Sequence, residues 1–308
     1  MQAYSPLALQ PGWVLERYLG WSCAIQEPGL KLLTKRRGLL RSHLLLTDHG
    51  SLEHLAAMIT QLRLVGPLQF LWVCHFGGET PCEDLACGGQ RLPPLADGRW
   101  FGTGTFVIDL TASEETLFSK ISARERTKLR QVERAGLSGD ATSSPARGDL
   151  AEFVALYGEM ARERGLERPT TGLLERMSRD GVLLLARCRS AEGRTLAANV
   201  AFAAHGQGYF LHGVRAREAA SGAGVLAQWT LMRALKAAGL RYYDLGLVAS
   251  TAEDDGRYRF KRSLGGTYVP FGQEYRHVPA WLRRPHQAFQ RARLRLVRQS
   301  GQGRPGDE

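Results

Sequence analysis

The sequence predicts an α/β protein, more narrowly of the α+β kind, built from two domains. Its 308 residues are long for one compact domain and comfortable for two of about 150 residues each. Apolar residues make up 44% of the chain, which is enough for a buried core in each domain. Helical periodicity and short alternating apolar runs succeed one another along the chain, so both helices and strands are expected.

The first 110 residues give few signals. Ser51 is a suitable helix N-cap, with Glu53 and His54 in the first turn, so a helix is expected from Ser51 to about Leu64. A Gly- and Pro-rich stretch over 77–104 is expected to be mostly loop. Apolar or alternating runs predict strands at 42–47, 68–75 and 105–110.

A strongly charged helix is predicted from Glu114 to Arg134. A narrow apolar stripe through Leu117 and Leu129 runs beside a row of basic residues that includes Arg126 and Arg130. The basic face is either a solvated helix surface or a phosphate-binding surface. The following segment, 136–148, is rich in Ser and Gly and is expected to be a linker.

The next segments predict two helices and a sheet. One helix is expected to begin at Asp149, which can cap it, and to stop near Gly165, and another runs from about Thr171 to Gly181. Three strand-like runs follow, at 182–188, 195–204 and 208–214. The turns between them are short, so the strands should form an antiparallel meander.

A crossover unit is predicted after the meander. The loop 215–224 leads into a helix over 225–238, and a strand follows at 241–245. This order places the helix N-terminus at a sheet edge, where backbone N–H groups favour anions. Gly222, Gly224 and the nearby Arg215 are the candidate donor-binding residues of this loop.

Two motifs then narrow the fold. They are Tyr243-Asp244-Leu245-Gly246 and Phe260-Lys261-Arg262-Ser263-Leu264-Gly265-Gly266. Together with the order of elements, they resemble the GNAT acyltransferases, and in particular the Fem-type peptidyltransferases. Members of that branch are aminoacyl-tRNA-dependent enzymes that add bridge residues to peptidoglycan precursors.

The resemblance covers roughly residues 105–280 and implies tandem GNAT-like domains. Each would be a mixed, mostly antiparallel sheet flanked by helices. The implied divisions are a divergent N-terminal domain over 1–135, which includes the basic helix from about 114, and an acyltransferase domain over 149–280. Residues 281–308 would form a basic, Arg-rich tail. Residues 1–104 match the family poorly.

The resemblance also implies the chemistry. Acyl transfer to an amine passes through an oxyanion that needs a positive or hydrogen-bonding partner, and the Lys of the Phe-Lys segment is implicated near the tRNA's terminal ester in Fem-type enzymes. Lys261 stands at that motif position here, although a surface lysine on a short helix is the alternative. Asp244 either orients the acceptor amine or caps the turn at Gly246, and His212 is a weaker candidate base. Gly246, Phe260 and Arg262 complete the expected donor and substrate site.

Two classes of acyl donor fit the resemblance, aminoacyl-tRNA and acyl-coenzyme A. In coenzyme A-dependent GNAT enzymes an Arg or Gln stands before the Gly-x-Gly loop with two residues in between, but that position is Ala219 here. The sequence therefore favours aminoacyl-tRNA as donor, with no further cofactor, and acyl-coenzyme A remains the alternative donor. The acceptor would be an amine of a peptidoglycan precursor or a similar small molecule, or, with the alternative donor, a polysaccharide or lipid. A degenerate scaffold that binds RNA or membrane without turnover is a third possibility.

Charge and cysteine content bear on partners and location. The net charge of +11, with 41 basic residues, favours an anionic partner such as tRNA, although genome base composition alone can raise Arg content. Eight arginines lie between 276 and 304 without an acidic residue. They could hold tRNA or rest on a membrane beside a lipid-linked cell-wall precursor, and a solvated helix with a frayed end is the alternative. Five scattered cysteines predict reduced thiols and no zinc site. Cys74 and Cys188 lie in apolar, strand-like runs, where a small buried residue is expected. No signal peptide or membrane span is recognisable, so a cytoplasmic protein is expected, with peripheral contact at the inner membrane face.

Overall fold

The structure is a computed structural model, and it describes residues 11–48, 51–76, 83–96, 99–164 and 169–283. The chain forms two compact units. Among the described residues, the first comprises those up to 104 together with 247–250 and 270–283, and the second comprises those between 105 and 246 together with 251–269. These limits differ from those expected from sequence: the basic helical segment lies in the second unit, and the segment after 270 returns to the first.

The first unit is built on a five-stranded sheet in the order β1-β2-β3-β4-β14. The strands are β1 (Ser22–Glu27), β2 (Leu30–Arg37), β3 (Leu40–Thr47), β4 (Gln69–His75) and β14 (Glu274–His277). Only β3 and β4 are parallel, and α3 (Leu52–Gln61) connects them. The remaining described pairs are antiparallel. The unit is thus a mixed, mostly antiparallel sheet, as expected.

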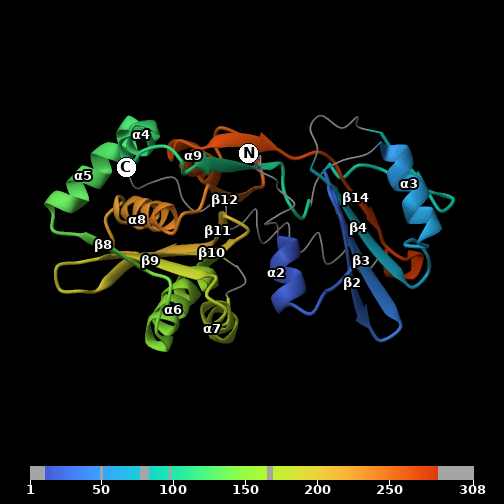
Figure 1. Cartoon of the computed structure of the whole chain (residues 1–308), viewed down its shortest axis with the longest axis horizontal. Helices are drawn as coiled ribbons and strands as arrows, with labels where there is room; N and C mark the ends of the chain where they lie inside the picture. The colour runs from blue at the N-terminus through green and yellow to red at the C-terminus, as the bar shows by residue number, and fades with distance from the viewer. Residues whose placement is uncertain (1–10, 49–50, 77–82, 97–98, 165–168, 284–308) are drawn as a thin grey trace. The chain divides into compact units, whose positions relative to one another are not determined.

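Two layers cover this sheet. In Figure 1, α3 lies on one face and α2 (Pro11–Tyr18) on the other. Ser51 caps α3 by accepting a hydrogen bond from His54 N at 3.2 Å, which confirms the predicted start. Leu55 and Ile59 of α3 pack with Leu45 and Val73 into one core, while Leu44 and Trp72 belong to the core on the opposite face.

Sequence patterns missed several elements of this unit. Strands β1 and β2 alternate polar with apolar residues only partly and were not predicted. The expected loop over 77–104 contains a small hairpin, β5 (Leu85–Cys87) with β6 (Gln90–Leu92). Leu85, Cys87 and Leu92 are buried against α3 in the core, so tertiary packing makes strands of a stretch that looks like loop.

The second unit is built on a seven-stranded sheet in the order β13-β7-β12-β11-β10-β9-β8. Its strands are β7 (Gly104–Asp109), β8 (Ser138–Thr142), β9 (Leu183–Arg189), β10 (Thr195–Ala204), β11 (Gln207–Arg215), β12 (Tyr242–Val248) and β13 (Thr267–Pro270). Strands β9, β10 and β11 form the predicted antiparallel meander. Strand β12 pairs in parallel with β11, which confirms the crossover.

Helices lie on both faces of this sheet (Figure 1). Helix α8 (Ala223–Ala237), the crossover helix, covers one face, and α6 (Arg147–Arg164) and α7 (Thr171–Arg179) cover the other. Residues Val225, Leu231 and Leu235 of α8 are buried. No described helix combines the length and hydropathy that a bilayer crossing requires.

The predicted basic helix is two helices. Helix α4 (Glu114–Lys120) ends at Ile121, whose backbone is extended, and Ser122 caps α5 (Ala123–Arg134) through a bond from Glu125 N at 3.4 Å. The serine supplies a second N-cap inside a stretch of continuous helical periodicity, so the chain turns there.

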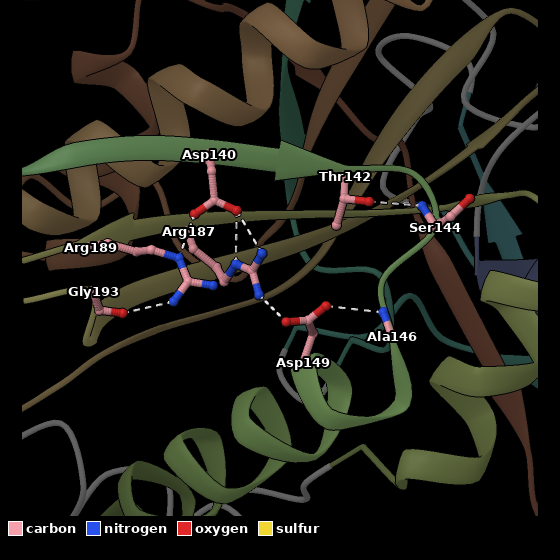
Figure 2. A network of polar contacts seen from close by, with 8 residues as sticks. All are labelled: Asp140, Thr142, Ser144, Ala146, Asp149, Arg187, Arg189 and Gly193. Atoms are coloured by element: carbon pink, nitrogen blue, oxygen red, sulfur yellow. Dashed lines mark hydrogen bonds and ion pairs between the residues drawn. The ribbon is translucent and has the colours of Figure 1, made fainter.

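The expected linker over 136–148 contains strand β8, which lies at the edge of the sheet. Figure 2 shows what holds it. Arg187 on β9 is buried and pairs with Asp140 of β8 at 2.6 Å and with Asp149 of α6, while Arg189 donates to Asp140 at 2.8 Å. Burial by itself raises the pKa of Asp149, but the bonds from Arg187 and Ala146 N more than offset it and lower that pKa overall. Asp149 therefore ties the first turn of α6 to the sheet.

Candidate active site

The centre of the second sheet opens where β11 and β12 part. The two strands pair through only three residue pairs, and the last is Tyr209 with Asp244. Strand β11 is irregular just beyond, because its register with β10 shifts between the His212 and Phe210 pairs. Parallel strands that separate at their carboxyl ends leave room for a ligand between them. This end of β12 carries the first of the two sequence motifs.

Gly246 turns the backbone at that end. Its φ is +78°, a left-handed value that non-glycine residues rarely adopt. A side chain at this position would also lie 3.2 Å from Phe210 O and 3.6 Å from Lys261 Nζ. The glycine therefore meets two needs, a left-handed backbone and close approach of the lysine.

The Gly246 carbonyl is where two side chains from other elements converge. Lys261 Nζ donates to it at 2.8 Å, and Thr105 Oγ1 of β7 lies 2.9 Å away. The same hydroxyl is 2.5 Å from Asp244 Oδ1. The structure thus brings Lys261, Asp244 and Gly246 together, as the motifs suggested, and adds Thr105.

Helix α9 (Gly256–Ser263) places Lys261. Asp255 caps it by accepting from Arg257 N at 2.8 Å and from Tyr258 N at 2.9 Å. The Tyr258 ring packs on Phe106 of β7 with ring centroids 5.5 Å apart. Lys261 lies three residues later, so it shares the sheet-facing side of the helix.

The environment of Lys261 lowers its pKa to about 8. Burial is the largest cause and Arg257 adds to it, whereas the Asp244 carboxylate opposes them. Near neutral pH the group is therefore a cation held partly out of water beside a carboxylate. A cation in such a place acts more strongly on a developing negative charge than one in solvent.

Asp244 is almost fully buried, with 1% of its surface exposed. Its Oδ1 accepts from Gly246 N at 2.7 Å and contacts Thr105. Of its two expected roles, these contacts favour the fixing of the Gly246 turn. The carboxylate also supports the positive charge of Lys261, so it acts on the site through its neighbours.

The start of α8 differs from a phosphate-binding loop. Gly222 is the N-cap residue, and a methyl group there would lie 2.7 Å from Val132 Cγ1 and 2.8 Å from Lys128 O, both of α5. Helix α5 thus packs against this turn, and close packing explains the glycine. Gly224 has space around it apart from Arg215 Cδ at 4.0 Å, and Arg215 donates to Ala219 O at 3.3 Å.

The two arginines selected from the basic helix have partners in the fold. Arg126 donates to the carbonyls of Ser119, at 2.7 Å, and Ile121, at the end of α4. The Arg130 guanidinium lies over the Phe118 ring at 5.6 Å. These contacts brace the junction of α4 and α5, and phosphate binding by either residue stays a prediction.

The flanking residues of the lysine motif point outward. Phe260 is 38% exposed, and Arg262 forms an exposed ion pair with Glu253 at 2.7 Å. Both residues belong to α9 and their side chains are exposed to solvent. Their roles in binding donor or substrate stay predictions.

The His212 ring lies 5.1 Å from the Tyr157 ring of α6, and burial lowers its pKa to about 4. The neutral imidazole lies on β11 beyond the point where the strands part. The thiols of Cys74 and Cys188 are buried as expected, and burial raises the pKa of Cys188 to about 11.

Thr105 was missed as a site residue. The sequence predicted the strand that contains Thr105. However, a threonine at the start of a strand is common, and the sequence gives no sign that its hydroxyl contacts both Asp244 and Gly246 of β12. The signal lies in the sheet order, where β7 is the neighbour of β12, and that order is not visible from the chain sequence.

Comparisons with known proteins agree with this geometry. Residues 119–262 match the family model described as the acetyltransferase (GNAT) domain. The solved structure of FemX is similar over 93% of this chain and 94% of that one, with a TM-score of 0.64 and 14% identity. The C-terminal domain of a protein assigned as lysylphosphatidylglycerol synthetase in Agrobacterium fabrum is similar over 83% and 84% of the chains, with a TM-score of 0.56 and 14% identity. L-PGS from Bacillus licheniformis gives a TM-score of 0.51 over 89% and 88%, also at 14% identity.

A comparison with curated protein sequences gives no match. The structural likenesses show the fold, and the family match locates a GNAT acyltransferase domain in the second unit. The predicted fold class is confirmed, and the resemblance to FemX is confirmed as one of fold.

Proposed function

We propose that this protein is an aminoacyltransferase that moves an amino acid from aminoacyl-tRNA to the amine of a peptidoglycan precursor or a similar small acceptor. The observation that carries the proposal is the Lys261 ammonium at the parted ends of β11 and β12. It is half-buried, fixed by the Gly246 carbonyl and supported by Asp244.

The reaction needs one positive group at one oxygen. Attack of the acceptor amine on the ester carbon forms a tetrahedral intermediate, in which the former carbonyl oxygen carries the negative charge. When the intermediate collapses, the bond to the ribose oxygen breaks and the tRNA hydroxyl leaves with a proton. Lys261 is the candidate for stabilising the oxyanion, and a fixed cation in a partly desolvated site suits that task.

The start of α8 supports aminoacyl-tRNA over acyl-coenzyme A. A pyrophosphate needs open backbone N–H groups at a helix N-terminus. Here the packing of Val132 and Lys128 against Gly222 occupies the space beside the N-cap, and Ala219 stands where an Arg or Gln would help. These features weaken the alternative of an acyl-coenzyme A-dependent transferase acting on polysaccharide or lipid.

The partners and place of action follow as parts of the proposal. A tRNA is a polyanion, and the chain carries a net charge of +11. The protein would act in the cytoplasm, at the inner membrane face if the precursor is lipid-linked. The Arg-rich tail, which was expected to contact tRNA or membrane, lies outside the described residues after 283.

The test compares the two donors with the purified full chain. Radiolabelled aminoacyl-tRNA or acetyl-coenzyme A is supplied with a preparation of peptidoglycan precursors, and labelled product is counted. The proposal expects product from aminoacyl-tRNA only, abolished by prior RNase treatment. Product from acetyl-coenzyme A, together with thermal stabilisation by coenzyme A, would establish the alternative instead.

A further inference from the structure

One end of the first unit's sheet brings three segments together. They are the β2–β3 turn (35–41), the loop before β4 (62–68) and the segment after β14 (278–283), and we call their surface the basic-apolar edge. Arg41 N donates to Leu68 O at 2.9 Å, and Trp281 Nε1 donates to Pro67 O at 2.8 Å. Figure 1 shows the β2–β3 turn and the end of β14 at the same end of the sheet.

The edge concentrates exposed apolar side chains. Seven large apolar residues of the described chain are exposed, and four of them lie here: Leu39 at 75%, Trp281 at 58%, Leu68 at 41% and Leu62 at 40%. Single exposed apolar residues are ordinary, but a group on one edge marks an interaction surface. Leu39 stands at the tip of the turn, where it has the least protein around it.

The charge on the edge is of one sign. The three segments contain six basic residues and no acidic one: Lys35, Arg36, Arg37, Arg41, Arg63 and Arg283. The acidic residues nearest in the sheet strands, Glu27 and Glu274, stand at the other end of β1 and of β14. The edge is therefore complementary to an anionic partner.

Backbone and side-chain contacts hold the edge in shape. Gly38 takes a left-handed φ of +60° in the turn, and Arg36 Nε donates to Gly38 O at 2.9 Å. His277 Nε2 lies 3.0 Å from Gly66 O and fixes the loop before β4 to β14. These contacts fix the β2–β3 hairpin, so Leu39 is held at its exposed tip.

We propose that the basic-apolar edge docks the protein on an anionic lipid bilayer. Leu39 would enter the acyl boundary, Trp281 would lie at the interface as tryptophans do, and the arginines would contact lipid phosphates. A nucleic acid would also suit the arginines, but it offers no hydrocarbon for a leucine that is 75% exposed. This proposal is independent of the donor and the acceptor in the transfer reaction.

The experiment is vesicle flotation with the full chain. Vesicles of phosphatidylcholine alone are compared with vesicles that also contain phosphatidylglycerol, and the protein should float only with the anionic ones. Leu39→Asp and Arg37→Glu should each weaken the apparent affinity about tenfold or more, because one removes an apolar side chain from the acyl boundary and the other replaces a cation at the anionic surface by an anion.

Arg179→Glu on α7 of the second unit is the matched control and should bind as the unchanged protein does. Thermal melting of Leu39→Asp should be unaltered, because Leu39 makes little contact with the fold. Unchanged flotation of both edge variants would overturn the proposal, as would equal binding to neutral vesicles. Loss of tRNA binding in the same variants, with flotation intact, would identify a nucleic acid as the occupant and reject the bilayer.

Discussion

Gly246 and Gly222 are both expected from sequence to belong to the donor and substrate site, and Gly246 lies in β12 whereas Gly222 is the N-cap residue of α8. In the structure they differ. Gly246 has a left-handed backbone, and its carbonyl receives the Lys261 ammonium at 2.8 Å. Gly222 has an ordinary helical backbone, and helix α5 packs where its side chain would be. A glycine in an expected ligand-binding segment can therefore be required either by the catalytic site or by close packing of the fold. The residues that surround it in space distinguish the two cases.

The largest effect is expected at the lysine that uses the Gly246 turn. Lys261→Met should reduce the rate of transfer about 100- to 1000-fold, the usual loss when one oxyanion partner is removed. Steady-state transfer assays measure this, and Lys120→Met, an exposed lysine on α4, should keep full activity. If Lys261→Met transfers at the normal rate, Lys261 does not stabilise the oxyanion. The contact between Lys261 and the Gly246 carbonyl would then have no role in catalysis.

Gly246→Ala should impair both stability and catalysis. The left-handed φ costs an alanine about 1–2 kcal/mol, and the new methyl group would press on Phe210 O and approach Lys261 Nζ. We expect a transfer rate lowered about tenfold, with a reduced melting temperature. If the variant only melts earlier and transfers at the normal rate, Gly246 belongs with Gly222 as a packing glycine.

Gly222→Ala should affect stability alone. Its methyl group meets Val132 and the Lys128 carbonyl, and overpacking of this kind costs about 1–3 kcal/mol. Denaturant unfolding measures the loss. Gly224→Ala is the control and should be neutral or slightly stabilising, because the position is open and helical. A raised KM for donor without loss of stability in Gly222→Ala would instead indicate a donor-binding loop.

Thr105→Val should have the smallest effect. It removes the hydroxyl that bridges Asp244 and the Gly246 carbonyl, which leaves a buried carboxylate with one partner fewer. The expected cost is about 1–2 kcal/mol of stability and a few-fold loss of transfer rate. Thr105→Ser keeps the hydroxyl and should restore most of the rate, an outcome that a purely steric role for Thr105 would not give.

The meander, the crossover and the lysine motif could be predicted from sequence because each depends on local periodicity, short turns or a dense motif. Strand β8 could not, because its place in the sheet depends on Arg187, which is 47 residues away from Asp140. The same holds for β14, a strand at the end of the chain that completes the first sheet by pairing with β4. Local patterns carry no information on such long-range pairs.

The site divides in the same way. Lys261, Asp244 and Gly246 were found because they sit in two compact motifs. Thr105 was not, because its role depends on β7 lying beside β12. Arg126 was selected for its charge, although the structure gives it the carbonyls at the end of α4. Charge patterns locate cations but do not reveal which of them the fold already employs.

The measurement that tests the central claim most directly is the pH dependence of single-turnover transfer from aminoacyl-tRNA. Lys261 is charged below its pKa of about 8, so its contribution to the rate should be complete below that pH and be lost as pH rises through it, which gives the profile an alkaline limb. In Lys261→Arg, whose guanidinium stays charged, the remaining rate should lose this alkaline limb. The same limb near pH 8 in both proteins would contradict the assignment of Lys261 as the group that stabilises the transition state.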